Sequence, residues 1–401
     1  MSLWTLAARS SFRQCTRTNI IPPRPLGSRP FSLSPFRFHP RVRGHLDEVP
    51  PIPRARNAFE EPFANEIRRP SVLGPALFAV GLSAGAYGLG ALYTNWDTNR
   101  WKVSLLANFM SVSSNNDLLS RYRKMELGNR LSANFERLKS ATAALPEAAA
   151  HQIQHLYLIV ANNWLNTPEG KRTCYAITAL NALIFVAWQI PRLGPIMRRG
   201  FMHHPLSGKS YTMITSVFSH VGVVHFAFNT IGLLSFGPTV HALLQRDSEE
   251  AQSTSRFHFL AFFLSAGVFA SFVSHLVTAR FRFPRLVAQL ADPVRAKALS
   301  TADAAILPSL GASGAIYGLL TYTALSFPEL SVSLIFLPMI PLPITGAVGG
   351  MVALDIIGLI RGWKSFDHWA HLAGAASGVI YYGYGMPFWH WFRAKMALIK
   401  T

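Results

Sequence analysis

Long apolar segments recur along this chain and restrict what it can fold into. A helix needs about 20 predominantly apolar residues to cross the hydrocarbon core of a bilayer. The first such segment covers residues 72–94, and six more follow from residue 173 onward. The six lie near 174–190, 221–243, 257–279, 309–326, 344–360 and 367–385. The pattern predicts an all-α polytopic membrane protein with one extra N-terminal transmembrane helix before a core of six.

The composition agrees with burial in lipid. Half of the residues are hydrophobic and only 14% are charged, whereas a soluble domain carries about a quarter charged residues. The formal net charge of +19 could indicate nucleic-acid binding. The basic residues, however, lie at the N-terminus and in loops, without a basic patch interleaved with aromatic residues. We therefore expect the lipid bilayer as the surroundings and no nucleic acid as a partner.

The first 46 residues have the composition of a targeting segment. They contain eight arginines, several Ser and Thr, no lysine and no acidic residue. Arg9, Arg13 and Arg17 recur every four residues, which lines them along one flank of a helix. These features predict a mitochondrial presequence over residues 1–46, followed by a linker over 47–71. The alternative is a disordered basic tail, which the prolines of this segment favour.

The segments outside the apolar helices complete the predicted organisation. Residues 95–172 are polar and of mixed charge, so we expect an extramembrane, partly helical connector. The core spans residues 173–390, and 391–401 form a C-terminal tail. The apolar stretch from Ser331 to Leu337 is too short to cross a bilayer, and three prolines follow it. We expect this stretch to be an interfacial loop that enters the fifth core helix.

Loop charge predicts an orientation. The loop after the first core helix is basic, with four positive residues and no acid, whereas the loop over 245–256 has more acidic than basic residues. This alternation continues through the later loops, as a consistent topology requires. In a mitochondrial inner membrane we expect the basic side to face the matrix. The N-terminus would then lie in the matrix and the C-terminus in the intermembrane space.

Three groups of polar residues occupy the even-numbered core helices. The second helix opens with His225 and Asn229, which are four residues apart and share one helical face. The fourth contains Ser313 within Gly-Ala-Ser-Gly, and the sixth contains His371. Even-numbered helices of an alternating bundle start on the same side of the membrane. Because each group lies near the start of its helix, all three are predicted to lie at one face and a similar depth.

These residue types suit nucleophilic catalysis. A serine needs a base, and His371 could take the proton of Ser313. The side chains of His225 and Asn229 and the backbone N–H of Ser313 could stabilise the oxyanion. Tyr317, one turn after Ser313, is placed to pack on the His371 ring. Four glycines would let the fourth and sixth helices approach closely enough for this: Gly314, Gly318, Gly374 and Gly378.

The six-helix block resembles the rhomboid family of intramembrane serine proteases over about residues 174–390. The motifs match in type and in order along the chain: His220 and His225 to Asn229, Gly311 to Gly314 with Tyr317 and Gly318, and Ala370-His371 with Gly374 and Gly378. The extra helix and the presequence resemble the mitochondrial, presenilin-associated rhomboid-like branch, in a fungal-type member. One departure is that residues 191–220 lack the Trp-Arg pair that many rhomboids carry in this loop.

The resemblance implies a function. It implies a Ser313–His371 dyad that hydrolyses peptide bonds in or near the transmembrane helices of single-pass membrane proteins, with no cofactor and no metal. For the mitochondrial branch, the implied substrates include a dynamin-like GTPase of inner-membrane fusion and a cytochrome c peroxidase precursor.

Other assignments of the same residues stay open or are unsupported. Asp367 could orient His371 or be an interfacial charge. Asp355, within the fifth apolar segment, could form a structural hydrogen bond or take part in catalysis. His368 and His371 have a three-residue spacing that could bind a metal, but no nearby set of carboxylates and histidines completes such a site. A zincin-type site is unsupported, because no His-Glu-x-x-His motif is present. The other functional class is a catalytically inactive scaffold or carrier that binds transmembrane helices. A carrier would be expected to show internal repeats, and none is clear.

Overall fold

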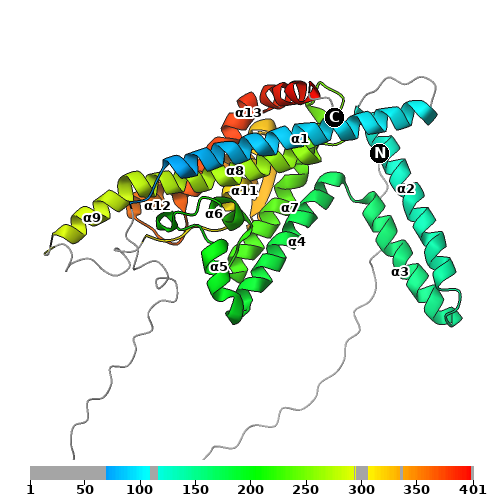
Figure 1. Cartoon of the computed structure of the whole chain (residues 1–401), viewed down its shortest axis with the longest axis horizontal. Coiled ribbons are helices and arrows are strands. Elements are labelled where there is room, and N and C mark those ends of the chain that lie inside the picture. Colours follow the sequence, from blue (N-terminus) through cyan, green and yellow to red (C-terminus); the bar gives the residue numbers. More distant parts are fainter. Residues whose placement is uncertain (1–68, 109–115, 293, 295–305, 335–336, 399–401) are drawn as a thin grey trace, which may run out of the picture. The chain divides into compact units, whose positions relative to one another are not determined.

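The structure is a computed structural model that describes residues 69–108, 116–292, 294, 306–334 and 337–398. These residues are mostly helical (Figure 1), which confirms the predicted all-α class. The predicted presequence lies outside the described residues, as does all but the end of the linker, so both remain predictions.

Three helices precede the core. They are α1 (Leu73–Asn108), α2 (Asn116–Ala141) and α3 (Glu147–Asn166). The first runs well beyond the expected end near residue 94, because no glycine or proline interrupts it there. Its second half is also held by the core: Ser253 donates a hydrogen bond to Asp97, and Thr98 is buried beside it. The expected connector therefore begins as a continuation of α1.

Six principal helices form the core. They are α4 (Glu169–Gln189), α7 (Val223–Arg246), α8 (Arg256–Val277), α11 (Ser313–Ser326), α12 (Ile344–Arg361) and α13 (His368–Ala397). A π-helical turn, η4 (Thr278–Arg282), extends α8 directly into α9 (Phe283–Ala291). The last helix, α13, continues past the expected end near residue 385 and includes most of the predicted tail.

Membrane-spanning character is clear for some of these helices. By length and composition, α1, α7, α12 and the continuous α8–α9 unit could each cross a bilayer. A fifth candidate combines α4 with Pro191–Gly200, at a bend of 96°. With only 14 residues, α11 is shorter than a bilayer is thick. The count for the described residues is thus four or five, and the one-plus-six arrangement stays a prediction.

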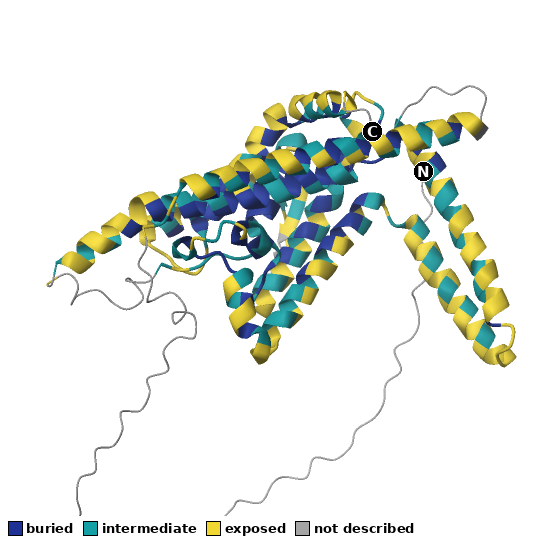
Figure 2. Ribbon diagram, in the orientation of Figure 1, coloured by how far each residue is buried: buried dark blue, intermediate teal, exposed yellow. Residues whose placement is uncertain are grey.

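The burial pattern explains the short helix. Figure 2 shows buried residues concentrated in the middle of the bundle, and ten of the 14 residues of α11 are buried. This helix packs against α7, α8 and α13. The outer faces of α1 and α12 instead expose large apolar side chains, such as Leu77 and Ile360. An apolar surface of this extent is expected where helices face lipid.

One expected loop is a β-hairpin. Strand β1 (Ser331–Leu334) pairs antiparallel with β2 (Leu337–Pro343), so the expected loop contains regular strands, and its interfacial position stays a prediction. A two-stranded hairpin leaves one edge of each strand unpaired, and prolines, which lack an N–H donor, are tolerated at such edges. The hairpin leads directly into α12, which begins at Ile344.

Two ends of the bundle can be distinguished. At one end, the ring of His275 near the end of α8 donates to the carbonyl of Ser71, just before α1. At the other end, Asp97 of α1 meets Ser253, just before α8. Thus α1 runs antiparallel to α8. The first of these ends also contains the starts of α7, α11 and α13.

Candidate active site

The candidate nucleophile, Ser313, begins α11 at a backbone turn that requires glycine. Gly311, two residues earlier, has a φ of 121°, in a region that residues with a Cβ rarely adopt. A Cβ at this position would also lie 2.6 Å from Cε1 of His225. Conformation and space both exclude a larger residue, and the chain can therefore pass close to His225 of α7 just before it reaches Ser313.

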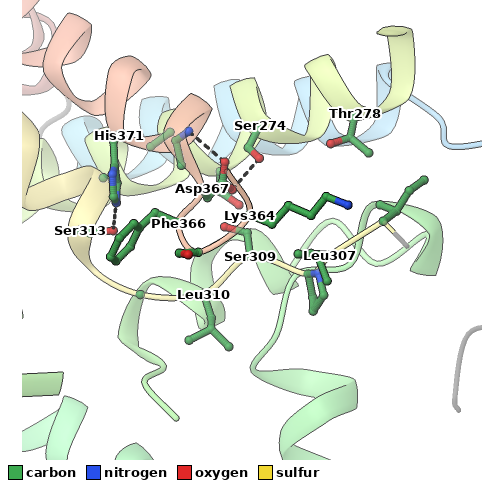
Figure 3. A pocket seen from close by; sticks show the side chains of 18 of the residues that line it. Ser274, Thr278, Leu307, Ser309, Leu310, Ser313, Lys364, Phe366, Asp367 and His371 are labelled. Carbon is green, nitrogen blue, oxygen red and sulfur yellow. Dashed lines mark hydrogen bonds between the residues drawn. The ribbon is translucent and has the colours of Figure 1, made fainter. Parts of the chain in front are cut away.

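The structure brings Ser313 and His371 together across 58 residues of sequence. The Oγ atom of Ser313 lies 2.9 Å from Nε2 of His371, within hydrogen-bonding distance (Figure 3). The phenol ring of Tyr317 stacks on the imidazole, with ring centroids 4.5 Å apart and planes 13° apart. His371 is only 9% exposed. A buried, stacked imidazole has few alternative rotamers, so the ring is held facing the serine.

Asp355 of α12 is the group whose role the sequence left open. Its Oδ1 atom lies 3.1 Å from Nδ1 of His371 and 2.6 Å from Nδ1 of His368. Its Oδ2 atom accepts a hydrogen bond of 2.8 Å from Tyr317. Since an ionised carboxylate only accepts, Nδ1 of His371 is assigned as the donor, which leaves Nε2 as an acceptor facing Ser313.

The position of Asp355 in the sequence indicates that the residue matters, but it does not indicate which residues bond to it. A carboxylate inside an apolar segment is expensive in lipid and points to function. Its partners come from two other helices, so spacing along α12 does not identify them.

Asp367 acts on the helix and not on the imidazole. Its side chain accepts a hydrogen bond from the backbone N–H of Ala370 and caps the start of α13. Its other oxygen accepts a bond of 2.6 Å from Ser274 of α8. These bonds fix the first turn of the helix that carries His371.

The residues expected to stabilise an oxyanion differ in whether they face the cavity beside Ser313. His225 borders the same cavity as Ser313. As the first residue of α11, Ser313 has a backbone N–H without an acceptor in its own helix. The amide nitrogen of Asn229, by contrast, donates to the carbonyl of His225 at 2.8 Å, and Asn229 does not line the cavity. It would have to release that bond before it could bind an oxyanion.

The segment before Ser313 is fastened to the first loop of the core. The backbones of Ser309 and His203 exchange two hydrogen bonds. Closer to the serine, the N–H of Ala312 donates to Nε2 of His220. Burial lowers the pKa of His203 to about 3 and the pKa of His220 to about 4, so both rings are neutral. This loop lacks the Trp-Arg pair, and its histidines still hold the segment that precedes Ser313.

Glycines line the contact between α11 and α13. A Cβ at Gly374 would overlap the carbonyl oxygen of Gly314, and one at Gly378 would lie 2.5 Å from the carbonyl oxygen of Gly318. On its other side, Gly314 meets Ala270 of α8. The backbones of α11 and α13 are therefore in direct contact, at a separation that any side chain at these positions would increase.

A cavity of about 510 Å³ opens beside the serine. Figure 3 shows Ser313 and His371 on one side of it, with Thr278 and Leu307 on the other. Its walls come from α8, α9, the segment before α11 and the segment before α13. Among the residues that the structure describes, no group of three or more His, Cys, Asp or Glu is arranged to hold a metal ion.

The sequence of this chain is similar to those of several known proteins. A family profile for the rhomboid domain matches residues 207–388, which include Ser313, His371, Asp355 and His225. The human Presenilin-associated rhomboid-like protein, mitochondrial, is 35% identical over 364 residues, covering 89% of this chain and 77% of that protein. The zebrafish Presenilin-associated rhomboid-like protein A, mitochondrial, is 29% identical, with 86% and 80% covered. Yeast Rhomboid protein 1, mitochondrial, is 28% identical, with 53% and 52% covered. The chain belongs to the rhomboid family, in its mitochondrial, presenilin-associated rhomboid-like branch.

Proposed function

We propose that the protein is an intramembrane serine endopeptidase in which Ser313 is the nucleophile and His371 the base. The observation that carries the proposal is the 2.9 Å contact between Ser313 Oγ and His371 Nε2. This contact lies in a bundle whose outer helices are apolar enough to cross a membrane. The family to which the chain belongs consists generally of serine proteases, which agrees with this chemistry.

The mechanism follows from the positions of the donors and acceptors. Oγ of Ser313 attacks the scissile carbonyl carbon while its proton moves to Nε2 of His371. The resulting oxyanion is stabilised by the backbone N–H of Ser313 and by His225, with Asn229 once its amide is released. When the C–N bond breaks, the proton passes from His371 to the leaving amine. A water molecule then hydrolyses the acyl-enzyme by the same route, and Ser313 recovers its proton.

Asp355 acts through His371. Its carboxylate holds the Nδ1 proton in place and lies where it can stabilise the imidazolium that forms during attack. Tyr317 donates to the other carboxylate oxygen and covers one face of the imidazole. We therefore assign Asp355 as a positioning residue that extends the expected dyad to a Ser–His–Asp arrangement.

The substrates proposed are single-pass proteins of the mitochondrial inner membrane or intermembrane space. The dynamin-like GTPase and the cytochrome c peroxidase precursor implied by the family resemblance belong to this class. The end of the bundle with the active site carries the basic loops, so we place that end and the N-terminus on the matrix side. The C-terminus is then in the intermembrane space.

Cleavage by purified protein tests the proposal. Full-length protein in detergent is incubated with a candidate single-pass substrate beside its Ser313→Ala and His371→Ala variants. Cleavage by the wild type and loss of at least about 10³-fold in each variant is expected. Equal cleavage by all three would refute the protease assignment. Substrate that stays bound but intact with every form would instead favour the scaffold alternative.

A further inference from the structure

The cavity that contains Ser313 also has a positively charged part. Arg282 closes the π-helical turn after α8, and Arg285 follows on α9; both line the cavity. Both are exposed, and neither forms an ion pair or hydrogen bond with another residue in the described parts of the chain. Two guanidinium groups that have no partner among the described residues therefore line the same cavity as Ser313.

Among the residues that the structure describes, acidic side chains do not balance this charge within the cavity. Among the described lining residues, Asp367 is the sole carboxylate, whereas Lys364 adds a third positive group. Asp367 is already engaged by Ser274 and by the N–H of Ala370. A cleft lined by one sign of charge concentrates the opposite charge. A guanidinium binds a carboxylate through two parallel hydrogen bonds, which adds geometric selectivity.

The distance between the serine and these arginines follows from α8. Ala270 of α8 lies level with the nucleophile, because a Cβ at Gly314, the residue after Ser313, would lie 2.5 Å from the Cβ of Ala270. Arg282 is roughly three turns further along the helix, or about 18 Å at 1.5 Å per residue. An extended chain advances about 3.3 Å per residue. A bound peptide would cover this distance in about five residues. The length of the arginine side chain shortens the distance that the peptide itself must cover.

We infer that this site selects substrates with an aspartate or glutamate about four to six residues from the scissile bond, bound through Arg282 and Arg285. The inference rests on the proposed protease function and adds a substrate class to it. Because the 22 residues of α8 that precede these positions already suffice to cross a bilayer, the acidic residue would lie in the segment flanking the substrate's transmembrane helix. Anionic lipid is the other possible ligand, but it does not account for two arginines in one cavity with Ser313.

A peptide library tests the inference without a known substrate. Full-length protein in neutral detergent micelles is incubated with peptides from a digested proteome, and cleavage sites are mapped by mass spectrometry. Sites also found with Ser313→Ala are subtracted. We expect Asp and Glu to be enriched several-fold four to six residues from the cut. The double variant Arg282→Glu/Arg285→Glu should lose this preference and favour Lys or Arg at those positions.

Arg280→Glu is the matched control. Arg280 is exposed on the same helical extension but does not line the cavity, so this variant should keep the acidic preference. Ser313-dependent cleavage without any acidic preference would overturn this inference and leave the proposed function intact. No Ser313-dependent cleavage would overturn both. Uniform loss of cleavage in the double variant, restored by anionic lipid for every peptide, would assign the arginines to lipid and refute the substrate role.

Discussion

At the scale of single residues, reactivity depends on how the imidazole is held. In the proposed mechanism Ser313 provides the attacking oxygen, and the tautomer of His371 decides whether Nε2 can accept its proton. That tautomer is set by Asp355, 3.1 Å from Nδ1. Tyr317 contributes twice, by stacking on the imidazole and by bonding to the same carboxylate. The two contributions of Tyr317 can be separated by mutation.

We expect Asp355→Asn to lower kcat by about 10²- to 10⁴-fold with little change in KM, because an amide no longer imposes the reactive tautomer. Tyr317→Phe keeps the stacked ring and removes one hydrogen bond, so it should lower kcat by less than about 10-fold. Steady-state kinetics on one substrate, with thermal unfolding of both variants, makes the comparison. Equal and small effects on kcat would limit Asp355 to a structural role.

At the scale of helices and strands, the sequence predicted the type of most elements but not their limits. Apolar length identified the core helices, and the polar groups at their starts indicated a common face. The extension of α1 could not be predicted, because polar residues such as Asp97 are stabilised by a loop distant in sequence. The hairpin of β1 and β2 was missed because prolines argue against strands unless the strand has a free edge. Asp355 could be recognised as unusual, but its partners depend on packing between helices.

The glycine contact between α11 and α13 gives a prediction at this scale. Gly374→Ala should lower the free energy of unfolding by about 1–3 kcal/mol and reduce turnover, because its Cβ would overlap the backbone of Gly314. Gly383→Ala, on the same helix, is the control, since nothing lies within 4 Å of a Cβ there. Thermal unfolding in detergent makes the measurement. Equal stability of the two variants would contradict the close packing of these helices.

The first loop gives a second prediction at this scale. Because the pKa of His203 is lowered to about 3 from an ordinary value of 6.5, the unfolded chain binds a proton between these values and the folded protein does not. Stability is therefore highest above pH 6.5 and falls as the pH is lowered. Between pH 6.5 and pH 5, protonation of His203 in the unfolded chain should lower the free energy of unfolding by about 2 kcal/mol. His203→Gln should flatten that pH dependence in chemical denaturation, and an unchanged slope would contradict the assignment.

At the scale of the whole molecule, the two ends of the bundle differ in chemistry. The active-site end carries the basic loops and the start of α1, whereas the loop between α7 and α8 at the other end is acidic. We expect these ends to face the matrix and the intermembrane space respectively. The proposed selection of acidic substrates at Arg282 and Arg285 belongs to the basic end, because both arginines lie on the extension of α8 at that end of the bundle.

Cysteine labelling tests this orientation. In a background without Cys15 and Cys174, Glu249→Cys and Ser365→Cys place one exposed thiol at each end of the bundle. A membrane-impermeant maleimide added to mitochondria with ruptured outer membranes should label the thiol at position 249. The thiol at 365 should react only after the inner membrane is permeabilised. The reverse pattern would invert the topology.

The central claim is that His371 activates Ser313 as a nucleophile, and covalent labelling measures this most directly. Purified full-length protein is treated with a fluorophosphonate, and the modified residue is located by mass spectrometry. We predict one adduct, on Ser313, formed by the wild type and reduced at least about 10²-fold in His371→Ala. Labelling of Ser313 at an equal rate in His371→Ala, or no labelling of Ser313 in a protein that cleaves its substrate, would contradict the account.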